Sequence, residues 1–486
     1  MALSGCASDF CVPTDGSLVT MIVNPVETGR NGTTNQHLYG TIQEALDAAS
    51  ADVATTVCVA SGTYYEQLTV RGNTRLVGEA TGDVFVRPPQ TDLDALPSAV
   101  DRTLLRVLSE ADRPISIKRI DVGGAAICAD IQGDGAVSIQ DARLTGCALG
   151  LRATGGSLTL RRTPIKNHSL QGVLLTDMDS AAFFEGELFH NGSDQAPGVD
   201  VDGYERAPSL SGVALGGALR ASGVAELSLS GMLLSDRAWT DDLVRVDGGR
   251  LTVTDTRIDL LGLARGGSTP ALRTADAHVT IDRVTLDGQG HGLLHATGTD
   301  RSVTVSNVAW RDDQPLEDPD APGARPAIVQ LDLSSTDPED PLGTGTGQST
   351  FEARHVSVNA SSPTLFAGVG ADDLKLLVIN SVLWGIGDGM AIDGPATHGL
   401  GFGYLLTDDT TLTGENIIDP NHLDFFTPGF GDTRYNVPAS DGPVRCRGVN
   451  LSNQRLDLLG NPRPFEGGDV AKAPDLGAIE LQEACP

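Results

Sequence analysis

Apolar and polar residues in the middle of the chain follow a pattern that recurs about every 22 residues. Three consecutive segments show it most clearly: SIKRIDVGG from Ser116, SIQDARLTG from Ser138 and TLRRTPIKN from Thr159. With the first residue of each segment as position zero, positions one and six are apolar in all three, and position eight is Gly or Asn. This spacing, with β-branched and turn-forming residues between, is typical of a bent strand and not of the 3.6-residue period of a helix.

The same pattern continues along most of the chain. Positions one, four and six of ten copies give thirty inward positions, of which only Thr163, Glu187 and Thr256 are not apolar. Self-similarity at a fixed period of this size is the signature of a solenoid, in which each unit buries its apolar face against its neighbours. The seven further copies begin at Phe183, Ser228, Thr252, Thr280, Thr304, Glu352 and Val378.

A second short alternating segment precedes each copy, such as GLRATGGSL before Thr159 and PALRTADAHV before Thr280. A unit therefore holds at least two short strands joined by Gly, Asn or Asp corners. It is too short to hold a crossover helix, which a βαβ arrangement would need. The pattern predicts an all-β chain that coils as a parallel β-helix, each coil hydrogen-bonded to the next.

Residues 40–79 predict how the solenoid begins. Thr41 followed by Glu44 is an N-terminal capping pattern, and the apolar residues of one helix face come after it. Strands are expected at TTVCVA, QLTV and RLVG. A TIQEAL-DAA helix followed by GTY and LVGE resembles the opening of the pectin-lyase-like superfamily of right-handed parallel β-helices. The resemblance implies a right-handed coil whose first turn is closed by the helix. The helix face comprises Ile42, Leu46 and Ala49.

The end of the chain carries a second resemblance. GNPRP at 460–464 and DLGAIE at 475–480 resemble the closing signature of the bacterial secreted β-helix group labelled choice-of-anchor Q, with Ile479 where an aromatic residue is usual. Members of that group are mostly surface or secreted proteins without an assigned reaction. We expect Arg463 and Asp475 to hold a C-terminal cap in place.

Loss of the repeat at both ends divides the chain into four parts. These are an extended leader or anchor segment (1–39), the cap helix and first coils (40–85), the β-helix (86–425) and the C-terminal cap (426–486). Pro-, Gly- and Asp-rich inserts interrupt the repeat and are expected to be loops, which in solenoids often lie on the binding face. The inserts lie near 192–210, 311–325 and 335–349.

The first residues and the cysteines indicate where in or outside the cell the protein is expected. Leu3-Ser4-Gly5-Cys6 resembles a bacterial lipobox, which implies lipidation of Cys6 and a lipid-anchored outer-membrane protein. The signal segment that precedes a lipobox is not in the sequence, so either the start is trimmed or misplaced, or the match is chance. Without Cys6 an even set of six cysteines remains.

Cys128 and Cys147 are 19 residues apart, close to one coil, and we expect them to form a disulfide between neighbouring coils. Disulfides indicate an oxidising compartment, which favours an extracellular or cell-surface location. The alternative is that some of these cysteines are buried free thiols. The other expected pairs are Cys446 with Cys485 and Cys11 with Cys58.

Charge restricts the partners. The chain has 64 acidic and 34 basic residues, a net charge of −30 that is spread along its length. Nucleic acid and anionic membrane surfaces attract basic patches, so neither is an expected ligand. No segment reads as a transmembrane span. The excess of acidic residues serves solubility or, as the alternative, binds calcium through Asp residues at the corners. On the first insert, Asp194, Asp200 and Asp202 are candidates for holding a metal. No cofactor is otherwise required.

Two clusters are candidates for catalysis. Asp282, Asp287 and His291 lie in DRVTLDGQGHG, whose GHG resembles an element of the polygalacturonase branch, although the other elements of that branch are missing. A glycoside hydrolase needs two carboxylates about 5 to 9.5 Å apart, and neighbouring coils could supply them.

The second cluster is Glu185, Glu187 and His190 in FFEGELFHN. Glu187 falls on an inward position, where an unpaired carboxylate would be costly, so it either has a function or marks a bulge. The pectin esterase elements and the G-x-S-x-G nucleophile motif are missing from the sequence.

The sequence therefore predicts a secreted or cell-surface β-helix that acts as a binding or structural module for a glycan or another surface protein. The alternative is a polysaccharide lyase or glycoside hydrolase that works along the coils. An aromatic content of 4% argues against a sugar-stacking groove, and Trp310 and Trp384 fall on inward positions. The oligomeric state is left open.

Overall fold

The chain divides into two compact units, Met1–Leu227 and Ser228–Pro486, and each is described by itself. The computed structural model describes residues 19–23, 36–50, 52–80, 82–89, 103–191, 218–235, 242–260, 270–287, 292–311, 328–334, 349–359, 366–368, 374–384, 392–393, 401–407, 415–418, 446–448, 456–463, 474–475 and 478–479. Most of the three predicted inserts, and Asp194, Asp200, Asp202, His291, Cys6, Cys11 and Cys485, lie outside these residues.

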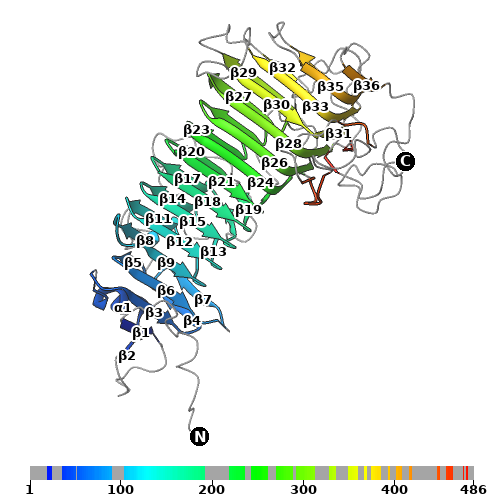
Figure 1. Ribbon diagram of the computed structural model, residues 1–486. Helices are drawn as coiled ribbons and strands as arrows, with labels where there is room; N and C mark the ends of the chain where they lie inside the picture. Colours follow the sequence, from blue (N-terminus) through cyan, green and yellow to red (C-terminus); the bar gives the residue numbers. More distant parts are fainter. Residues whose placement is uncertain are drawn as a thin grey trace. The chain divides into compact units, whose positions relative to one another are not determined.

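In its described residues the first unit consists of short strands and the helix α1 (Ile42–Ala48) (Figure 1). Strand β21 (Glu226–Ser230) contains the boundary between the units. The strands of the first unit are β1 (Val19–Val23), β2 (Gln36–Tyr39), β3 (Thr55–Val59), β4 (Gly62–Tyr65), β5 (Leu68–Arg71), β6 (Thr74–Gly78), β7 (Val84–Arg87), β8 (Thr103–Ser109), β9 (Ile115–Lys118), β10 (Asp121–Gly123), β11 (Ile127–Gly133), β12 (Ala136–Gln140), β13 (Arg143–Thr145), β14 (Leu149–Thr154), β15 (Ser157–Arg161), β16 (Ile165–His168), β17 (Gln171–Thr176), β18 (Ser180–Phe184), β19 (Glu187–Asn191) and β20 (Leu219–Ser222).

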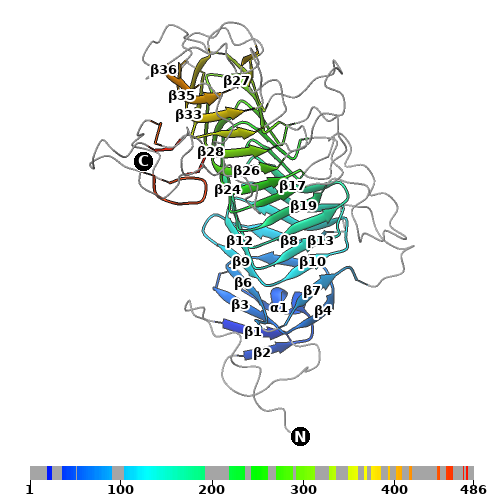
Figure 2. The same cartoon turned by 90° about the vertical axis from the view of Figure 1, so that its right-hand side faces the viewer.

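These strands stack in three parallel faces. The first face contains β3, β6, β9, β12, β15 and β18. The second contains β4, β7, β10, β13, β16 and β19, and the third β5, β8, β11, β14, β17 and β20. Figure 2 shows first-face strands beside second-face strands. The chain visits the three faces in turn, so the unit is a right-handed parallel β-helix, as predicted.

The start of the coil follows the predicted capping pattern. The Thr41 hydroxyl accepts a hydrogen bond from the amide of Glu44 (3.2 Å), and α1 buries its apolar face. The carboxylate of Glu66 accepts from the amides of Ile42 and Gln43 (2.9 and 2.8 Å), so two more free N–H groups of the first turn are bonded. Within the expected leader 1–39, β1 and β2 are strands, and β1 pairs in parallel with both β2 and β3.

The predicted inward positions form the core of the first unit. Ile117, Ile139 and Leu160 pair in register, and each is at most 2% exposed. The copy predicted to begin at Phe183 is displaced by one residue, because Leu160 pairs with Phe183 itself. Glu187 is therefore a half-buried outward residue, and its neighbour Leu188 points inward. Phe183 and Phe184 are adjacent and both apolar, so the pattern could not fix this register.

A sharp bend joins the first and second faces at position three of each copy. The residue there has a left-handed backbone, which costs non-glycine residues energy. In the first unit these bend residues alternate in charge: Arg119, Asp141, Arg162 and Glu185, with φ from 46° to 57°. Arg162 pairs with Asp141 of the preceding coil (2.6 Å) and with Glu185 of the following one (3.2 Å). The ion pairs stabilise the bend column from coil to coil.

Inside the coil, a second column lies where the second face meets the third. His168 and Asn191 occupy equivalent places in successive coils, and each faces a glycine. A Cβ on Gly150 would lie 2.7 Å from the ring of His168, and one on Gly172 would lie 2.9 Å from the side chain of Asn191. The side chains at the corner therefore require glycine at the start of β14 and β17.

One coil earlier, a cysteine of β11 takes the place of that glycine. Cys128 forms the predicted disulfide with Cys147, with the two Cα atoms 5.7 Å apart. Cys58 and Cys446 are also disulfide-bonded, while their predicted partners lie outside the described residues. The disulfide thus links neighbouring coils in the corner column.

The second unit repeats this design in its described residues. In β24, β26, β28 and β33 the first and second faces form one ten-residue strand that bends at Asp255, Arg283, Asn307 and Asn380, respectively. These strands, with β22, β30, β31, β35 and β36, form one parallel series. The third face contains β23, β25, β27, β29, β32 and β34.

The register of the second unit agrees with the sequence except at one copy. Val253, Ile281 and Val305 are buried as predicted. The copy placed at Val378 begins one residue earlier, because Ala353 pairs with Val378. The strands are β22 (Leu233–Ser235), β23 (Val244–Asp247), β24 (Arg250–Asp259), β25 (Leu272–Ala275), β26 (His278–Asp287), β27 (Leu294–Thr299), β28 (Ser302–Arg311), β29 (Val329–Ser334), β30 (Thr350–Arg354), β31 (Ser357–Asn359), β32 (Phe366–Gly368), β33 (Lys375–Trp384), β34 (Ile392–Asp393), β35 (Gly401–Thr407) and β36 (Glu415–Ile418).

The described C-terminal residues pack against the outer side of β28 and β31. Leu458, Ala478 and Ile479 form an apolar cluster with Ala309. The buried Arg463 donates to the Asn307 side chain (3.1 Å) and to the carbonyl of Ala478 (2.9 Å). Asp475 accepts from the amide of Cys446 (2.7 Å). Both residues expected to hold the cap thus bond within this C-terminal segment or to the coil beneath it.

Shortening an inward side chain should destabilise the coil, whereas its outward neighbour should tolerate the change. We expect Ile139→Ala to lower the free energy of unfolding by about 2 to 5 kcal/mol, because it opens a cavity in a stacked core. The adjacent, half-buried Gln140→Ala should change it by about 0.5 kcal/mol or less. Urea unfolding of both variants measures this. Equal effects would contradict the assignment of inward and outward positions.

The buried imidazole predicts acid sensitivity. Burial lowers the pKa of His168 from 6.5 to about 4, so the folded protein holds it neutral while the unfolded chain protonates it. Stability should therefore fall as the pH drops from 6.5 to 4, by about 3 kcal/mol from this group. His168→Asn copies the residue of the next coil and should flatten this part of the curve of unfolding free energy against pH. If the unfolding free energies of the wild type and of His168→Asn fall equally between pH 6.5 and 4, His168 is not the source of the acid sensitivity.

Candidate functional site

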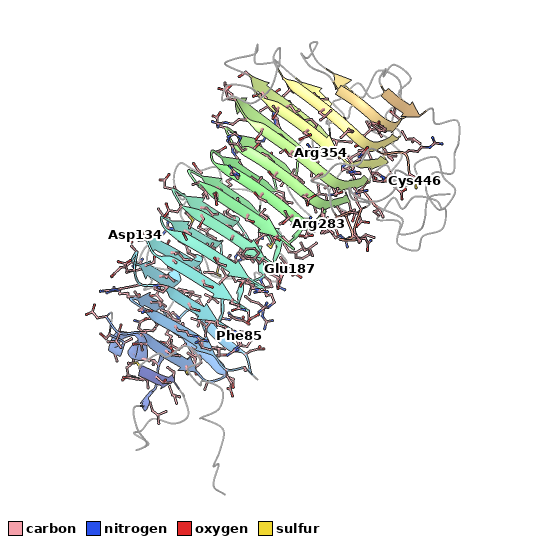
Figure 3. All side chains as sticks on the ribbon, in the orientation of Figure 1. Phe85, Asp134, Glu187, Arg283, Arg354 and Cys446 are labelled. Atoms are coloured by element: carbon pink, nitrogen blue, oxygen red, sulfur yellow. A yellow bond between two sulfur atoms is a disulfide. The ribbon has the colours of Figure 1, made fainter. Side chains whose placement is uncertain are left out.

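The structure separates the members of the first predicted cluster. Asp282 and Asp287 lie on β26, on either side of the bend at Arg283 (Figure 3). Asp282 forms an ion pair with Arg283, and its Oδ1 accepts from the Ser306 hydroxyl (2.7 Å) and the Asn307 amide (2.8 Å). These contacts give Asp282 a structural role at the bend. Its assignment to catalysis stays a prediction that nothing in the described geometry supports.

Asp287 lies on the second face and is 5% exposed. It pairs with Arg257 of β24 (3.2 Å). Arg257 also pairs with Asp259 of its own strand (3.1 Å). Asp282 and Asp287 therefore belong to different ion-pair groups on different faces. His291, the third member of the cluster, lies outside the described residues.

The second predicted cluster contains a bend residue. Glu185 is exposed and binds Arg161 (3.1 Å) and Arg162 (3.2 Å), whose hydrogen bonds lower the pKa of its carboxyl. Glu187 begins β19 on the outer side of the second face (Figure 3). The structure does not describe the side chain of His190. The ion pairs of Glu185 support a structural role, and the catalytic assignment of this cluster remains untested.

The third face of the second unit carries a polar row that the apolar pattern did not reveal. Arg245, Arg273, His295 and Gln330 are directly in register on the neighbouring strands β23, β25, β27 and β29. All four are half-buried and point away from the core. The row places four hydrogen-bonding side chains side by side, one on each strand.

Two carboxylates join this row into a network. Arg273 pairs through Nε with Asp242 (2.7 Å), and its Nη1 donates to Nδ1 of His295 (3.0 Å). Because an arginine can only donate, Nδ1 is the acceptor and Nε2 carries the proton. Nε2–H then donates to Asp332 (2.8 Å). We call Asp242, Arg273, His295 and Asp332 the third-face network.

The network is partly open to solvent. The side chains of Arg273 and Asp332 are 32% and 30% exposed, while His295 is 14% and Asp242 only 2% exposed. The buried Oδ1 of Asp332 has no hydrogen-bond partner in the described part of the chain. Solvent thus reaches mainly Arg273 and Asp332, while the buried Asp242 holds the guanidinium of Arg273 in place.

The first unit has a simpler version on the same face. Arg152 binds Asp130 through two hydrogen bonds of 2.8 Å, and Gln132 donates to the same carboxylate (2.8 Å). Arg152, Arg273 and His295 all stand at the same place in the alternating segments GLRAT, ALRT and LLHAT. This recurring polar residue was the signal in the sequence, and an alignment on apolar positions alone passes over it.

The described residues offer no helix long and apolar enough to cross a membrane. They hold one group of three ligand-type side chains in metal-binding proximity: Cys128, Cys147 and His168.

No family model matches the chain, and no curated protein matches it. Solved structures with a similar course of the chain include the pectate lyase Pel9A (12% identity, covering 96% of this chain and 97% of that one, TM-score 0.33). A GH87 alpha-1,3-glucanase from Streptomyces thermodiastaticus is 12% identical over 85% of this chain and 68% of its own (TM-score 0.42). A surface adhesin of Streptococcus pneumoniae, PfbA, is 9% identical over 75% and 88% (TM-score 0.31).

The strand pairing itself defines the class of protein. Three faces of parallel strands visited in turn form a right-handed parallel β-helix. With identities of 12% or less and TM-scores below 0.5, these three solved structures carry no conclusion about this chain.

The network allows a paired test on adjacent strands. Arg273→Met should lower the free energy of unfolding by about 3 kcal/mol, because it removes the ion pair of the buried Asp242. Arg245→Met on the next strand should cost about 1 kcal/mol or less, because Arg245 and Asp247 are 3.4 Å apart and both about 40% exposed. Chemical unfolding of the two variants measures this. A larger loss of stability in Arg245→Met than in Arg273→Met would refute the proposed difference in burial.

Proposed function

We propose that the protein is a secreted or cell-surface binding module that recognises a glycan on the third face of its second unit. The observation that carries the proposal is the third-face network with its neighbours Arg245, Asp247 and Gln330. Together they present arginine, carboxylate, imidazole and amide groups on adjacent strands. Sugar hydroxyls both donate and accept hydrogen bonds, and a mixture of such groups at fixed positions suits them.

The side chains are already held in position before a ligand arrives. Arg273 is fixed by Asp242 and His295, and Asp332 by His295 and Gln330 (3.4 Å). A ligand therefore does not have to immobilise them, which lowers the entropy cost of binding. Strands of a face follow one another every 4.8 Å or so. An extended polymer lying across them would meet one polar side chain of the row on each strand.

Charge favours a neutral glycan over an acidic one. On this surface Arg245 pairs with Asp247 and Arg273 with Asp242, while Asp332 bonds to His295, so the two arginines and three carboxylates nearly balance. The chain as a whole carries −30, and this field repels polyanions. The disulfides support export to an oxidising compartment. Lipidation of Cys6 and calcium binding remain part of the proposal.

The His295–Asp332 pair favours a second candidate, a lyase or glycoside hydrolase. An imidazole bonded to a carboxylate can act as an acid or a base. Both ring nitrogens of His295 are engaged, however, and accepting a proton at Nδ1 would require it to release Arg273. We therefore rank binding above catalysis.

A glycan array tests the proposal. The purified chain is screened against neutral and acidic glycans, with and without calcium, and any ligand found is measured by calorimetry. We expect binding to a neutral glycan that Asp332→Asn and Arg273→Met weaken at least tenfold, with Gln140→Ala on the first unit as the unaffected control. Binding that survives both substitutions would refute the assigned surface. Release of shorter sugars from the bound glycan would favour the enzyme.

A further inference from the structure

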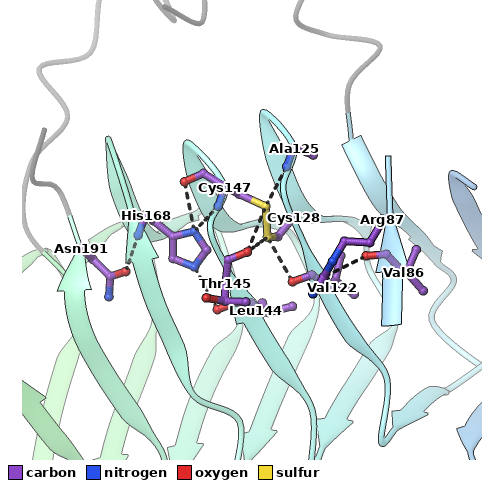
Figure 4. The surroundings of a disulfide bond; sticks show 10 residues. All are labelled: Val86, Arg87, Val122, Ala125, Cys128, Leu144, Thr145, Cys147, His168 and Asn191. Carbon is purple, nitrogen blue, oxygen red and sulfur yellow. Dashed lines mark hydrogen bonds between the residues drawn. A yellow bond between two sulfur atoms is a disulfide. The ribbon is translucent and has the colours of Figure 1, made fainter. Parts of the chain in front are cut away.

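The corner column of the first unit brings two sulfurs and an imidazole together in the core (Figure 4). Ligand atoms of Cys128, Cys147 and His168 lie within 4.8 Å of one another, and all three residues are buried. They come from successive coils and from opposite sides of one corner. Two sulfurs and one histidine nitrogen form a donor set that zinc-class cations prefer.

Backbone groups contact both ring nitrogens of His168. Nε2 of His168 donates to the carbonyl of Leu144 (3.1 Å), which fixes the tautomer and leaves Nδ1 as the acceptor. Nδ1 faces Cys147, whose amide N–H donates to it (3.2 Å) and whose carbonyl oxygen lies 3.3 Å away. A cation at Nδ1 would therefore replace the hydrogen bond from the amide. Histidines that bind metals commonly donate their other ring N–H to a backbone carbonyl, which orients the ring.

The two sulfurs belong to neighbouring coils of the stack. In the two following coils a glycine faces the corner side chain, but in this coil a cysteine does so. The two cysteine Cα atoms are 5.7 Å apart. Two thiolates on one tetrahedral ion are separated by about 3.7 Å, as Zn–S bonds of about 2.3 Å require.

We propose that the reduced form of this corner is a binding site for one zinc-class cation, held by Cys128, Cys147 and His168. A dithiol reductant first supplies two electrons and two protons to the disulfide, giving two thiols while the reductant becomes a disulfide. The cation then displaces the two thiol protons, which go to solvent, and binds both thiolates and a nitrogen of His168. Neighbouring coils are thus cross-linked in either redox state. This inference is independent of the proposed glycan surface.

Cobalt(II) is the probe for this site. The full chain is reduced with a dithiol, freed of reductant under argon and titrated with Co²⁺. We expect one equivalent with sulfur-to-cobalt charge-transfer bands and tetrahedral ligand-field bands, which Zn²⁺ displaces. Other reduced cysteines also bind cobalt, so the signal is taken as the difference from Cys128→Ser/Cys147→Ser. Release of two protons per ion is the second readout.

His168→Asn keeps both thiols and should shift the ligand-field bands and weaken binding at least tenfold. The oxidised chain should lack this equivalent. If the reduced wild-type chain and the double serine variant bind equal amounts of cobalt, the site does not exist. If His168→Asn leaves spectrum and affinity unchanged, the histidine is not a ligand and the proposal fails. Circular dichroism of each variant verifies that the coil is folded.

Discussion

Parallel pairing without a shift of register is the constraint on which the rest of this protein depends. Each residue of a face lies beside its equivalent in the next coil, as Ile117, Ile139 and Leu160 do. The side chain at each position therefore has to fit beside the equivalent side chain of the next coil, about 4.8 Å away. Apolar residues satisfy this inside. Outside, and at the bends, charges satisfy it only when they alternate or are paired, as Asp141 and Arg162 are.

This constraint explains how much of the fold the sequence could reveal. Apolar repetition identified the β-helix and most inward positions, and the near-coil spacing of Cys128 and Cys147 identified their disulfide. The two misplaced copies both contain adjacent apolar residues, such as Phe183 and Phe184, where either register buries a large side chain. Pairing with the neighbouring coils then decides the register, and the sequence of one segment does not show this pairing.

The candidate sites were harder to predict for a related reason. A carboxylate in the sequence shows its charge but not its partners. Asp282 and Glu185 looked available for catalysis, yet both are bonded at bends where their neighbours are arginines. The third-face network is the converse case. Arg273 and His295 stand alone in sequence, and only stacking places them 3.0 Å apart.

The alternating bend column also restricts how this chain can change in length. Arg119, Asp141, Arg162 and Glu185 succeed one another with opposite sign. Loss of the single coil that holds Asp141 would bring two arginines together, and duplication of one coil would set two like charges side by side. Removal or gain of two coils at once would keep the order of signs. In this region, evolution by repeat number should therefore proceed in even steps.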